Sequence, residues 1–211
     1  MVQIKSFDTY AAEYDLWFEE YPFVFQSELA AIKMQLLKVG ENVQGVEIGM
    51  GSGRFAKALG IKEGVEPARR LREMAMNRGV EAMNAHAERL PYRDMHFDFV
   101  LFVTICCLDK VTVALREAFR VLKPGGSVIV AFIEKDSLIG VAYDKKRETS
   151  HFYKHATFYT AERVETLLKN AGFKRLDFVQ TLFGDLNEIH ELQSPKPGFG
   201  EGSFIVVKAD K

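Results

Sequence analysis

Cysteine and long apolar runs are scarce in this sequence, and each shortage excludes a class of protein. Only two of the 211 residues are cysteines, and because Cys106 and Cys107 are adjacent they do not provide the disulfide framework of a small secreted domain. No uninterrupted apolar stretch approaches the length of a membrane span, and residues 1–8 lack the basic and apolar regions of a signal peptide. We therefore expect a soluble cytoplasmic protein with no membrane span.

An excess of positive charge is also missing. The chain carries 28 Lys and Arg residues against 29 Asp and Glu residues and contains no basic block, which argues against nucleic acid as the main partner. Its length suffices for one well-packed domain but not for two. We predict a single domain over residues 1–211, in which residues 1–24 form a helical N-terminal cover segment.

The most informative stretch is rich in glycine. A short apolar strand pattern from Val46 to Ile48 leads into Gly49, Gly51 and Gly53, and a helical pattern follows. Glycine at every second position removes Cβ atoms and permits positive φ, so the backbone can approach a ligand closely while the next helix presents unpaired N–H groups. The alternative is a turn that only allows a helix to pack closely on a strand.

The spacing of these glycines differs from the dinucleotide fingerprint G-x-G-x-x-G, because Arg54 stands where that fingerprint has its third glycine. An acid, Glu47, precedes the glycines and gives the pattern E-x-G-x-G-x-G. This pattern resembles the first motif of the class I S-adenosylmethionine-dependent methyltransferases of the small-molecule type. A nicotinamide-dependent oxidoreductase on a doubly wound sheet is the nearest alternative, and Arg54 argues against it.

Further segments match the same family in the same order along the chain. They are the F-D-x-x-A-x-x-Y-D segment at 7–15, the acid Glu66 at the end of a second strand pattern, Leu90-Pro91-Tyr92 with Phe97-Asp98-Phe99-Val100, and Arg120-Val121-Leu122-Lys123-Pro124-Gly125-Gly126. The last of these is the most specific match, and we interpret it as a turn from a helix into a strand.

The resemblance implies an α/β, Rossmann-like, seven-stranded mixed sheet with the order 3-2-1-4-5-7-6, strand 7 antiparallel and helices on both faces. The residue patterns agree with it, since 97–103 is a continuous apolar run typical of a strand buried on both faces. We expect the other strands at 46–48, 60–66, 80–85, 127–133, 173–183 and 203–208. Helical patterns cover 25–36, 68–78, 111–122 and 160–171, and Phe25, Leu29, Ile32 and Leu36 share one helix face.

The resemblance also implies S-adenosylmethionine as the cofactor and a set of residues that bind it. Glu47 would orient the glycine loop and reach the cofactor amine through water, and Gly49 and Gly51 would leave room for its amino-acid arm. Glu66 would accept hydrogen bonds from the ribose hydroxyls. The complete predicted set is Glu47, Gly49, Met50, Gly51, Gly53, Glu66, His86, Ala87 and Thr104.

One position departs from the family. An Asp often ends the third strand there and accepts a hydrogen bond from the adenine amino group, whereas alignment on Leu90-Pro91 places His86 at this point. A neutral imidazole has one nitrogen that can accept this bond, and an imidazolium has none. The backbone N–H of Ala87 would reach the adenine ring. The alternative is that Glu88 meets the adenine while His86 stacks on the ring or points to solvent.

The predicted activity is transfer of a methyl group to a small-molecule acceptor. A methyl group on a sulfonium is already activated, so positioning is the main requirement, and we name no catalytic base. A cofactor-binding regulator without transfer activity is a further alternative. No metal is expected, because the histidines at 151 and 155 have no acid or cysteine to complete a ligand set. The acceptor atom and the oligomeric state stay open.

We also predict a lid over the ligand crevice at the carboxyl ends of the strands. Three segments would border it, namely the aromatic N-terminal segment with Tyr10, Tyr14 and Trp17, the insertion at 134–159 and the loop at 187–202. Cys106 and Cys107 fall near this crevice too. Without a catalytic partner they are better interpreted as small buried side chains than as nucleophiles.

Overall fold

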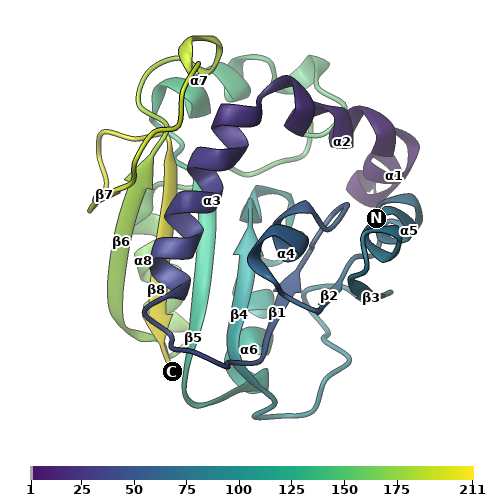
Figure 1. Cartoon of the computed structure of the whole chain (residues 1–211), viewed down its shortest axis with the longest axis vertical. Coiled ribbons are helices and arrows are strands. Elements are labelled where there is room, and N and C mark those ends of the chain that lie inside the picture. The colour runs from purple at the N-terminus through teal and green to yellow at the C-terminus, as the bar shows by residue number, and fades with distance from the viewer. Residues whose placement is uncertain (1) are drawn as a thin grey trace.

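The computed structural model describes residues 2–211 as an open β-sheet with helices packed on both faces (Figure 1). The helices are α1 (Val2–Thr9), α2 (Ala11–Glu20), α3 (Pro22–Leu36), α4 (Arg54–Leu59), α5 (Arg69–Asn77), α6 (Val111–Val121), α7 (Leu138–Lys145) and α8 (Ala161–Asn170), with short 3-10 turns η1 (Ile105–Cys107), η2 (Arg147–Thr149) and η3 (Leu186–Glu188). The strands are β1 (Gly45–Ile48), β2 (Glu63–Val65), β3 (Glu81–Met83), β4 (Phe97–Val103), β5 (Leu122–Ile133), β6 (Lys174–Thr181), β7 (Lys196–Pro197) and β8 (Phe204–Asp210).

The strand order confirms the predicted sheet. It is β3-β2-β1-β4-β5-β8-β6-β7, in which β8 takes the place of the seventh strand and runs antiparallel to both β5 and β6. The pairs among β3, β2, β1, β4 and β5 are all parallel. The two-residue strand β7 is an eighth strand that the sequence did not indicate, and it pairs with β6 at the edge.

The sheet separates two apolar cores, which explains why its central strands are apolar throughout. On β4, Val100 and Phe102 pack in the core with α6 and α8, while Phe99 and Leu101 pack in the core with α3 and α4. In Figure 1, α3 lies in front of the sheet and α8 behind it. A strand covered on both faces buries every side chain, so the alternation of apolar and polar residues disappears.

The buried face of α3 differs from the predicted one. Ile32 is fully buried, but Phe25, Leu29 and Leu36 are only half-buried. The face that is most buried contains Val24, Ser27, Glu28, Ala31, Ile32 and Gln35. The helix therefore buries three polar side chains within its apolar stripe, and each of them requires an explanation.

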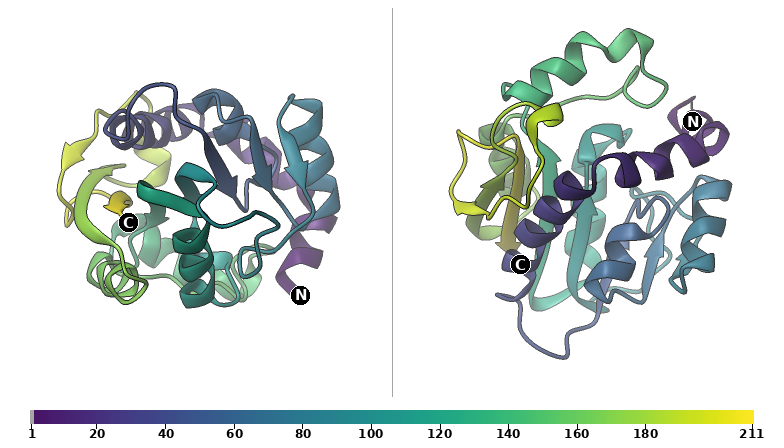
Figure 2. Two further views of the ribbon diagram at one scale, coloured as in Figure 1. Left: turned by 90° about the horizontal axis from the view of Figure 1, so that it is seen from below. Right: turned by 45° about the horizontal axis from the view of Figure 1, so that its top comes forward.

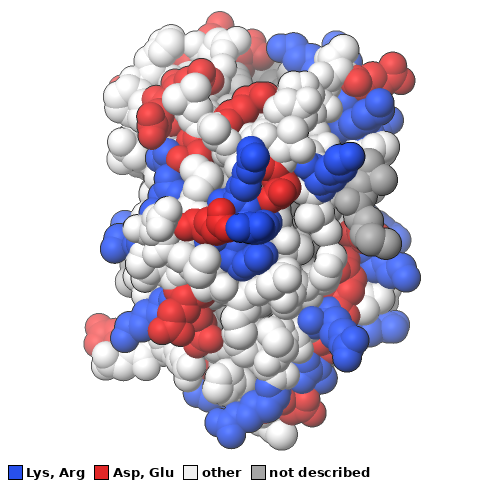
Figure 3. Space-filling model, turned by 90° about the vertical axis from the view of Figure 1, so that its right-hand side faces the viewer, with Lys and Arg blue, Asp and Glu red and all other residues white. Residues whose placement is uncertain are grey.

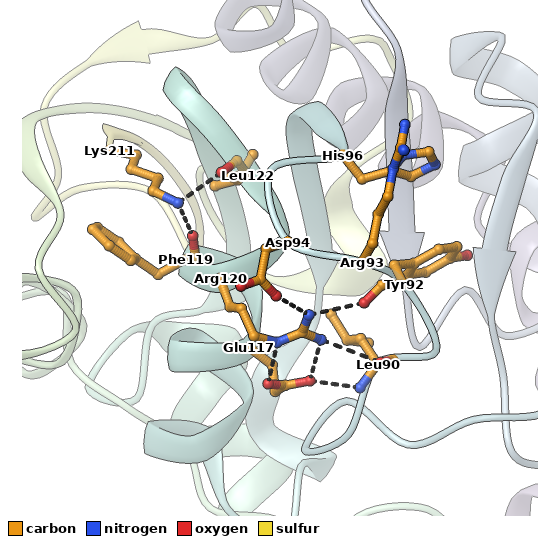
Figure 4. Close-up of polar contacts among 10 residues, drawn as sticks. All are labelled: Leu90, Tyr92, Arg93, Asp94, His96, Glu117, Phe119, Arg120, Leu122 and Lys211. Atoms are coloured by element: carbon orange, nitrogen blue, oxygen red, sulfur yellow. Dashed lines mark hydrogen bonds and ion pairs between the residues drawn. The ribbon is translucent and has the colours of Figure 1, made fainter.

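The segment around Arg120 has the structural role that was expected of it, and it also fixes a loop. Helix α6 ends at Val121 and β5 begins at Leu122. The Arg120 guanidinium donates hydrogen bonds to Glu117, to Asp94 at 2.7 Å and to the carbonyl oxygens of Leu90 and Tyr92 at 3.2 and 2.8 Å (Figure 4). One side chain thus holds the segment between β3 and β4 against α6.

Candidate active site

A cavity of about 490 Å³ lies at the carboxyl ends of the parallel strands. The glycine loop after β1, the ends of β2 and β4, the N-terminal helices and the segment after α7 all contribute to its wall. This volume is in the range of cavities that enclose a small ligand. Of the residues predicted for the site, the cavity brings together Glu47, Gly49, Met50, Gly51, Glu66, His86, Ala87 and Thr104.

Gly53 alone among the predicted residues is not part of the cavity wall. It begins α4 with a positive φ of 76°, and a Cβ at this position would lie 2.9 Å from the Cβ of Ala75 on α5. Its glycine is required by helix packing. The alternative interpretation, in which a glycine only allows close packing, therefore holds for Gly53. Gly49 and Gly51, in contrast, form part of the cavity wall.

The first two glycines give the loop its open shape. Gly49 and Gly51 have φ values of 70° and 55°, a region that favours glycine. A Cβ at Gly49 would meet no atom within 4 Å, while a Cβ at Gly51 would lie 2.8 Å from the Tyr14 hydroxyl. The loop thus presents bare backbone to the cavity at Gly49 and accommodates the Tyr14 side chain at Gly51.

Glu47 lies beneath the loop and is buried with one oxygen, Oε2, that has no hydrogen-bond partner. Burial raises the pKa of Glu47 to about 8; a hydrogen bond from the Ala56 backbone opposes this rise and the charge of Glu66 adds to it. The N–H of Ala56 belongs to the first turn of α4. This N–H therefore bonds Glu47 and is not one of the unpaired N–H groups that the helix was expected to present to a ligand.

Glu66, at the end of β2, holds the loop from the other side. Its Oε2 accepts a hydrogen bond from the Gly51 N–H at 2.9 Å, and its Oε1 accepts one from the Ala68 N–H at 2.8 Å. Burial raises the pKa of Glu66 to about 7, and these two backbone hydrogen bonds limit the rise. Each carboxylate oxygen has a second lone pair, so the group can still accept a bond from a ligand.

The residues after β3 border the cavity mouth. The His86 side chain is exposed there, Ala87 is buried, and the Glu88 carboxylate accepts a hydrogen bond from the Lys110 N–H at 2.9 Å. Glu88 is thereby engaged with the start of α6. Of the two side chains considered for the adenine, His86 is the one that is not held by a neighbouring element.

Thr104 follows β4 in a backbone conformation that is rare for its type. Its φ is 59°, within the left-handed region that β-branched residues seldom adopt. The Thr104 N–H donates a hydrogen bond to the Ala131 carbonyl at 2.8 Å, which fixes this turn to β5. Strained residues of this kind often mark sites of function, and this one lies on the cavity wall.

The N-terminal helices are fastened to the glycine-loop side of the cavity through Asp15. Its carboxylate accepts hydrogen bonds from Ser52 at 2.5 Å, from Arg54 at 2.7 Å and from Arg78 at 2.6 Å. Burial alone would raise its pKa, but these three partners outweigh burial and lower the pKa of Asp15 to about 2. Asp15 is therefore ionised at any physiological pH and ties α2 to α4 and α5.

Asp8 and Phe7, two other residues of the N-terminal motif, also contact neighbouring elements. The Asp8 carboxylate accepts a hydrogen bond from the Arg70 N–H at 2.7 Å, at the first turn of α5. The Phe7 ring contacts the rings of Tyr14 and Phe152 at centroid distances of 5.7 and 5.3 Å. The F-D-x-x-A-x-x-Y-D segment thus connects α5, the glycine loop and the insertion.

The insertion at 134–159 covers the cavity together with the N-terminal helices, as expected. It contributes Tyr143, Lys146, Phe152 and Tyr153 to the wall, and Trp17 and Tyr14 come from α2. His151 stacks on the Tyr10 ring at 3.7 Å and lies 3.2 Å from the Glu13 carboxylate. In Figure 2 (right), the green α7 segment and the purple N-terminal helices approach each other on the same side of the molecule.

The third predicted part of the lid is wrong. No residue of the loop at 187–202 lies on the cavity wall, although all of them are among the described residues. The Gln193 N–H donates to the Ser27 hydroxyl on the α3 helix, and β7 pairs with β6. The strand order β5-β8-β6-β7 places this loop at the far edge of the sheet, away from β1 and β4.

Glu28 is a residue of the site that the sequence analysis missed. It lies on α3, is only 5% exposed, and its carboxyl group forms no hydrogen bond with any of the described residues. Hydrophobic periodicity cannot identify a polar residue inside an apolar stripe. The available signal was the position of this acid on the same helix face as Val24, Ala31 and Ile32.

Figure 3 shows Lys, Arg, Asp and Glu side chains interspersed on the face in view. Within residues 2–211, no helix is long and apolar enough to cross a lipid bilayer. The same residues contain no group of three or more His, Cys, Asp or Glu side chains placed to hold a metal ion.

Comparison with known proteins assigns the family. A model of the methyltransferase domain matches residues 46–130. The crystal structure of an S-adenosylmethionine-dependent methyltransferase from Thermotoga maritima, described as a possible histamine N-methyltransferase, superimposes with a TM-score of 0.93 and 43% identity over 98% of this chain and 99% of that one.

Two sequence relatives extend this result. An uncharacterized protein of Methanocaldococcus jannaschii is 39% identical over 99% of this chain and 100% of its own length. A ubiquinone/menaquinone biosynthesis C-methyltransferase of Pseudomonas fluorescens is 43% identical over 36% of this chain and 30% of its own length. Since the similarity to the Thermotoga enzyme covers nearly the whole of both chains, this protein belongs to the S-adenosylmethionine-dependent methyltransferases.

Proposed function

We propose that this protein binds S-adenosylmethionine in the cavity and transfers its methyl group to a small-molecule acceptor. The main support is the convergence of three features on one wall, namely the open backbone at Gly49, the unpartnered Oε2 of Glu47 and the Glu66 carboxylate. The open backbone would accommodate the amino-acid arm of the cofactor. Glu47 would accept a hydrogen bond from its amine, directly or through water, and Glu66 would bind the ribose hydroxyls.

Other cavity residues fit the remainder of the cofactor. Met50 is buried beside the loop, and His86 and Ala87 border the mouth next to β3. There the imidazole of His86 and the N–H of Ala87 would bind the adenine. Glu88 is less suited to this role because its carboxylate already accepts a hydrogen bond from Lys110.

When bound, S-adenosylmethionine supplies a methyl group on a positively charged sulfur, which any well-placed nucleophile can attack. The contribution of the protein is to hold the acceptor in line and to exclude water. Trp17, Phe152 and Tyr153 form an aromatic wall over the cavity. An enclosed aromatic wall favours a small, partly apolar acceptor over a polymer.

Calorimetric titration tests the cofactor assignment. S-adenosylmethionine and S-adenosylhomocysteine should bind. NAD should bind far more weakly, because Arg54 stands where the dinucleotide fingerprint has its third glycine. Replacement of Glu66 by Ala should weaken cofactor binding by about 1–3 kcal/mol, because the ribose loses a charged acceptor.

Glu63→Ala is the matched control, because Glu63 lies at the other end of the same short strand. It should leave cofactor affinity unchanged. Tight binding of NAD without competition from S-adenosylhomocysteine would overturn the proposal. An unchanged affinity in Glu66→Ala would remove Glu66 from the site.

A further inference from the structure

The cavity contains a carboxyl group that the binding of the cofactor does not use. Glu28 lies on α3, which is separate from the glycine loop and from the ends of β2 and β3. The side chain is only 5% exposed and borders the cavity. On that helix face, Ser27 donates a hydrogen bond to the Phe23 carbonyl, and Gln35 donates one through Nε2 to the Asp177 carbonyl while its Oε1 has no partner in the described part of the chain. Glu28 has none among the described residues.

An unpartnered buried carboxyl group is costly, because ionisation in an apolar environment is opposed unless a cation or hydrogen-bond donor compensates. The charge of Glu28 acts on the hydroxyls of Tyr14 and Tyr143, whose pKa values are raised mainly by burial and to a smaller extent by this charge. Neither hydroxyl forms a hydrogen bond with it. The compensating group is therefore expected to come from a ligand.

The charge of the cavity wall indicates the sign of that ligand. Among the described residues, the only Lys or Arg on the wall is Lys146, which is exposed. Besides Glu47 and Glu66, which the proposed cofactor site uses, and Glu88, which accepts a hydrogen bond from the Lys110 N–H, the acids on the wall are Glu13, Glu20, Glu28 and Asp109. A cavity with this imbalance attracts a cation and repels an anionic acceptor.

The aromatic side chains of the cavity indicate the shape of the ligand. Trp17, Phe18 and Tyr143 line the same cavity as Glu28, and aromatic faces bind ammonium groups through cation–π attraction. A carboxylate and aromatic rings in one cavity match a small apolar molecule that ends in an amine.

We propose that the methyl acceptor is a small, partly apolar amine and that Glu28 binds its ammonium group and takes one proton from it. This inference rests on the proposed methyl transfer and specifies the acceptor for it. Glu28 would thus be a catalytic residue of the acceptor site.

The proton and electron balance is simple. The ammonium gives one proton to the Glu28 carboxylate and becomes a neutral amine with a free lone pair. That lone pair forms the bond from nitrogen to the methyl carbon while the bond from this carbon to sulfur breaks, and the electron pair of the broken bond stays on sulfur. The methylated product leaves as a cation, and Glu28 returns its proton to solvent.

The acidity of Glu28 suits this transfer. Burial raises the pKa of Glu28 to about 8, which brings it within roughly two to three units of an ordinary alkylammonium group. Proton transfer between groups of similar pKa needs little driving force. A carboxylate of ordinary acidity would remove this proton far less readily.

Binding of matched pairs of amines and alcohols to the S-adenosylhomocysteine complex tests the proposal without turnover. The pairs are phenethylamine and phenethyl alcohol, benzylamine and benzyl alcohol, and butylamine and butanol. In the native protein at least one amine should bind about tenfold or more tightly than its alcohol. Glu28→Gln should abolish this preference while alcohol and S-adenosylhomocysteine affinities stay within roughly threefold.

Glu20→Gln is the matched control, because Glu20 is an exposed acid on the same cavity wall. It should preserve the amine preference. The inference is overturned if none of the amines binds better than its alcohol, if Glu28→Gln retains the preference, or if Glu20→Gln loses it equally. Failure of the native protein to bind S-adenosylhomocysteine would instead reject the proposed function itself.

Discussion

Three buried carboxyl groups with raised pKa values line one cavity. Burial is the largest cause for Glu28, Glu47 and Glu66, whose pKa values are about 8, about 8 and about 7. Two of these groups are held in part by backbone N–H groups, from Ala56 for Glu47 and from Gly51 and Ala68 for Glu66. No backbone N–H group of the described residues holds Glu28. The free energy of unfolding should therefore depend most directly on the ionisation of this carboxyl group when no acceptor is bound.

This dependence should appear as a pH-dependent difference in stability between the native protein and Glu28→Gln. The folded-state pKa of Glu28 is about 8, against 4.5 for an ordinary glutamate. Between these values the folded protein holds the proton more tightly than the unfolded chain, so this group makes the native protein less stable as pH rises. The neutral glutamine avoids the penalty. Glu28→Gln should therefore gain roughly 2–4 kcal/mol of relative stability between pH 5 and pH 8.5.

Urea denaturation at several pH values measures this difference. Glu20→Gln should follow the native curve within about 0.5 kcal/mol, as expected for an exposed side chain. Parallel curves for the native protein and Glu28→Gln would show that the Glu28 carboxyl group reaches solvent and ionises normally.

Single residues also show the limit of sequence reasoning. The glycine loop and Glu66 could be predicted because their spacing is a local pattern, and the structure brings all but Gly53 to the cavity. Glu28 could not, because its significance depends on which neighbours surround it after folding. The predicted face of α3, formed by Phe25, Leu29, Ile32 and Leu36, did not include Glu28.

At the scale of elements, the cavity depends on how α1 and α2 are attached. The ion pairs of Asp15 with Arg54 and Arg78 involve side chains that are mostly shielded from solvent, whereas Glu19, the other partner of Arg54, is 64% exposed. Removal of one partner from a shielded pair leaves the other charge uncompensated, which costs more free energy than the loss of an exposed pair.

Asp15→Asn should therefore lower the free energy of unfolding by roughly 1–3 kcal/mol at pH 7 and loosen α2. The pKa of Asp15 is lowered to about 2, so its contribution is present above the ordinary pKa of Asp and is lost as pH falls toward 2. The difference between the two proteins should shrink over that acidic range. Hydrogen exchange of residues 2–20 should become faster in the variant.

Glu19→Gln provides the comparison, since it removes only the exposed partner of Arg54. Its stability and exchange rates should match the native protein within about 0.5 kcal/mol. An equal effect of the two substitutions would mean that general surface charge, and not the Asp15 network, fastens these helices.

The elements themselves could mostly be predicted, and the exceptions have physical reasons. The central strands could be recognised because a continuous apolar run is typical of a strand that is buried on both faces. Strand β7 was not, since two residues carry no periodicity and its pairing depends on a distant strand. The loop at 187–202 was expected at the ligand crevice, but the strand order places it at the far edge of the sheet, where the Gln193 N–H donates a hydrogen bond to Ser27 on α3.

At the scale of the whole molecule, the contacts predict one cooperative unit over the described residues 2–211. The N-terminal helices contact α4, α5 and the insertion through Asp15, Asp8 and Tyr10, so they have no independent core. Thermal unfolding followed by Trp17 fluorescence should coincide with unfolding followed by far-ultraviolet circular dichroism. An earlier Trp17 transition would show that residues 1–24 unfold separately and that the cover can open alone.

The two edges of the sheet determine how the molecule behaves in a crowded solution. A central sheet this apolar would be prone to edge-to-edge aggregation if its outer strands were long and regular. One edge, β3, has only three residues, and at the other Pro197 of β7 has no N–H to donate to a further strand. The rest of β6 is interrupted by an irregularity between Lys174 and Asp177. Both edges are therefore poor templates for strand addition, and the protein should stay dispersed at concentrations where a regular open sheet would form fibres.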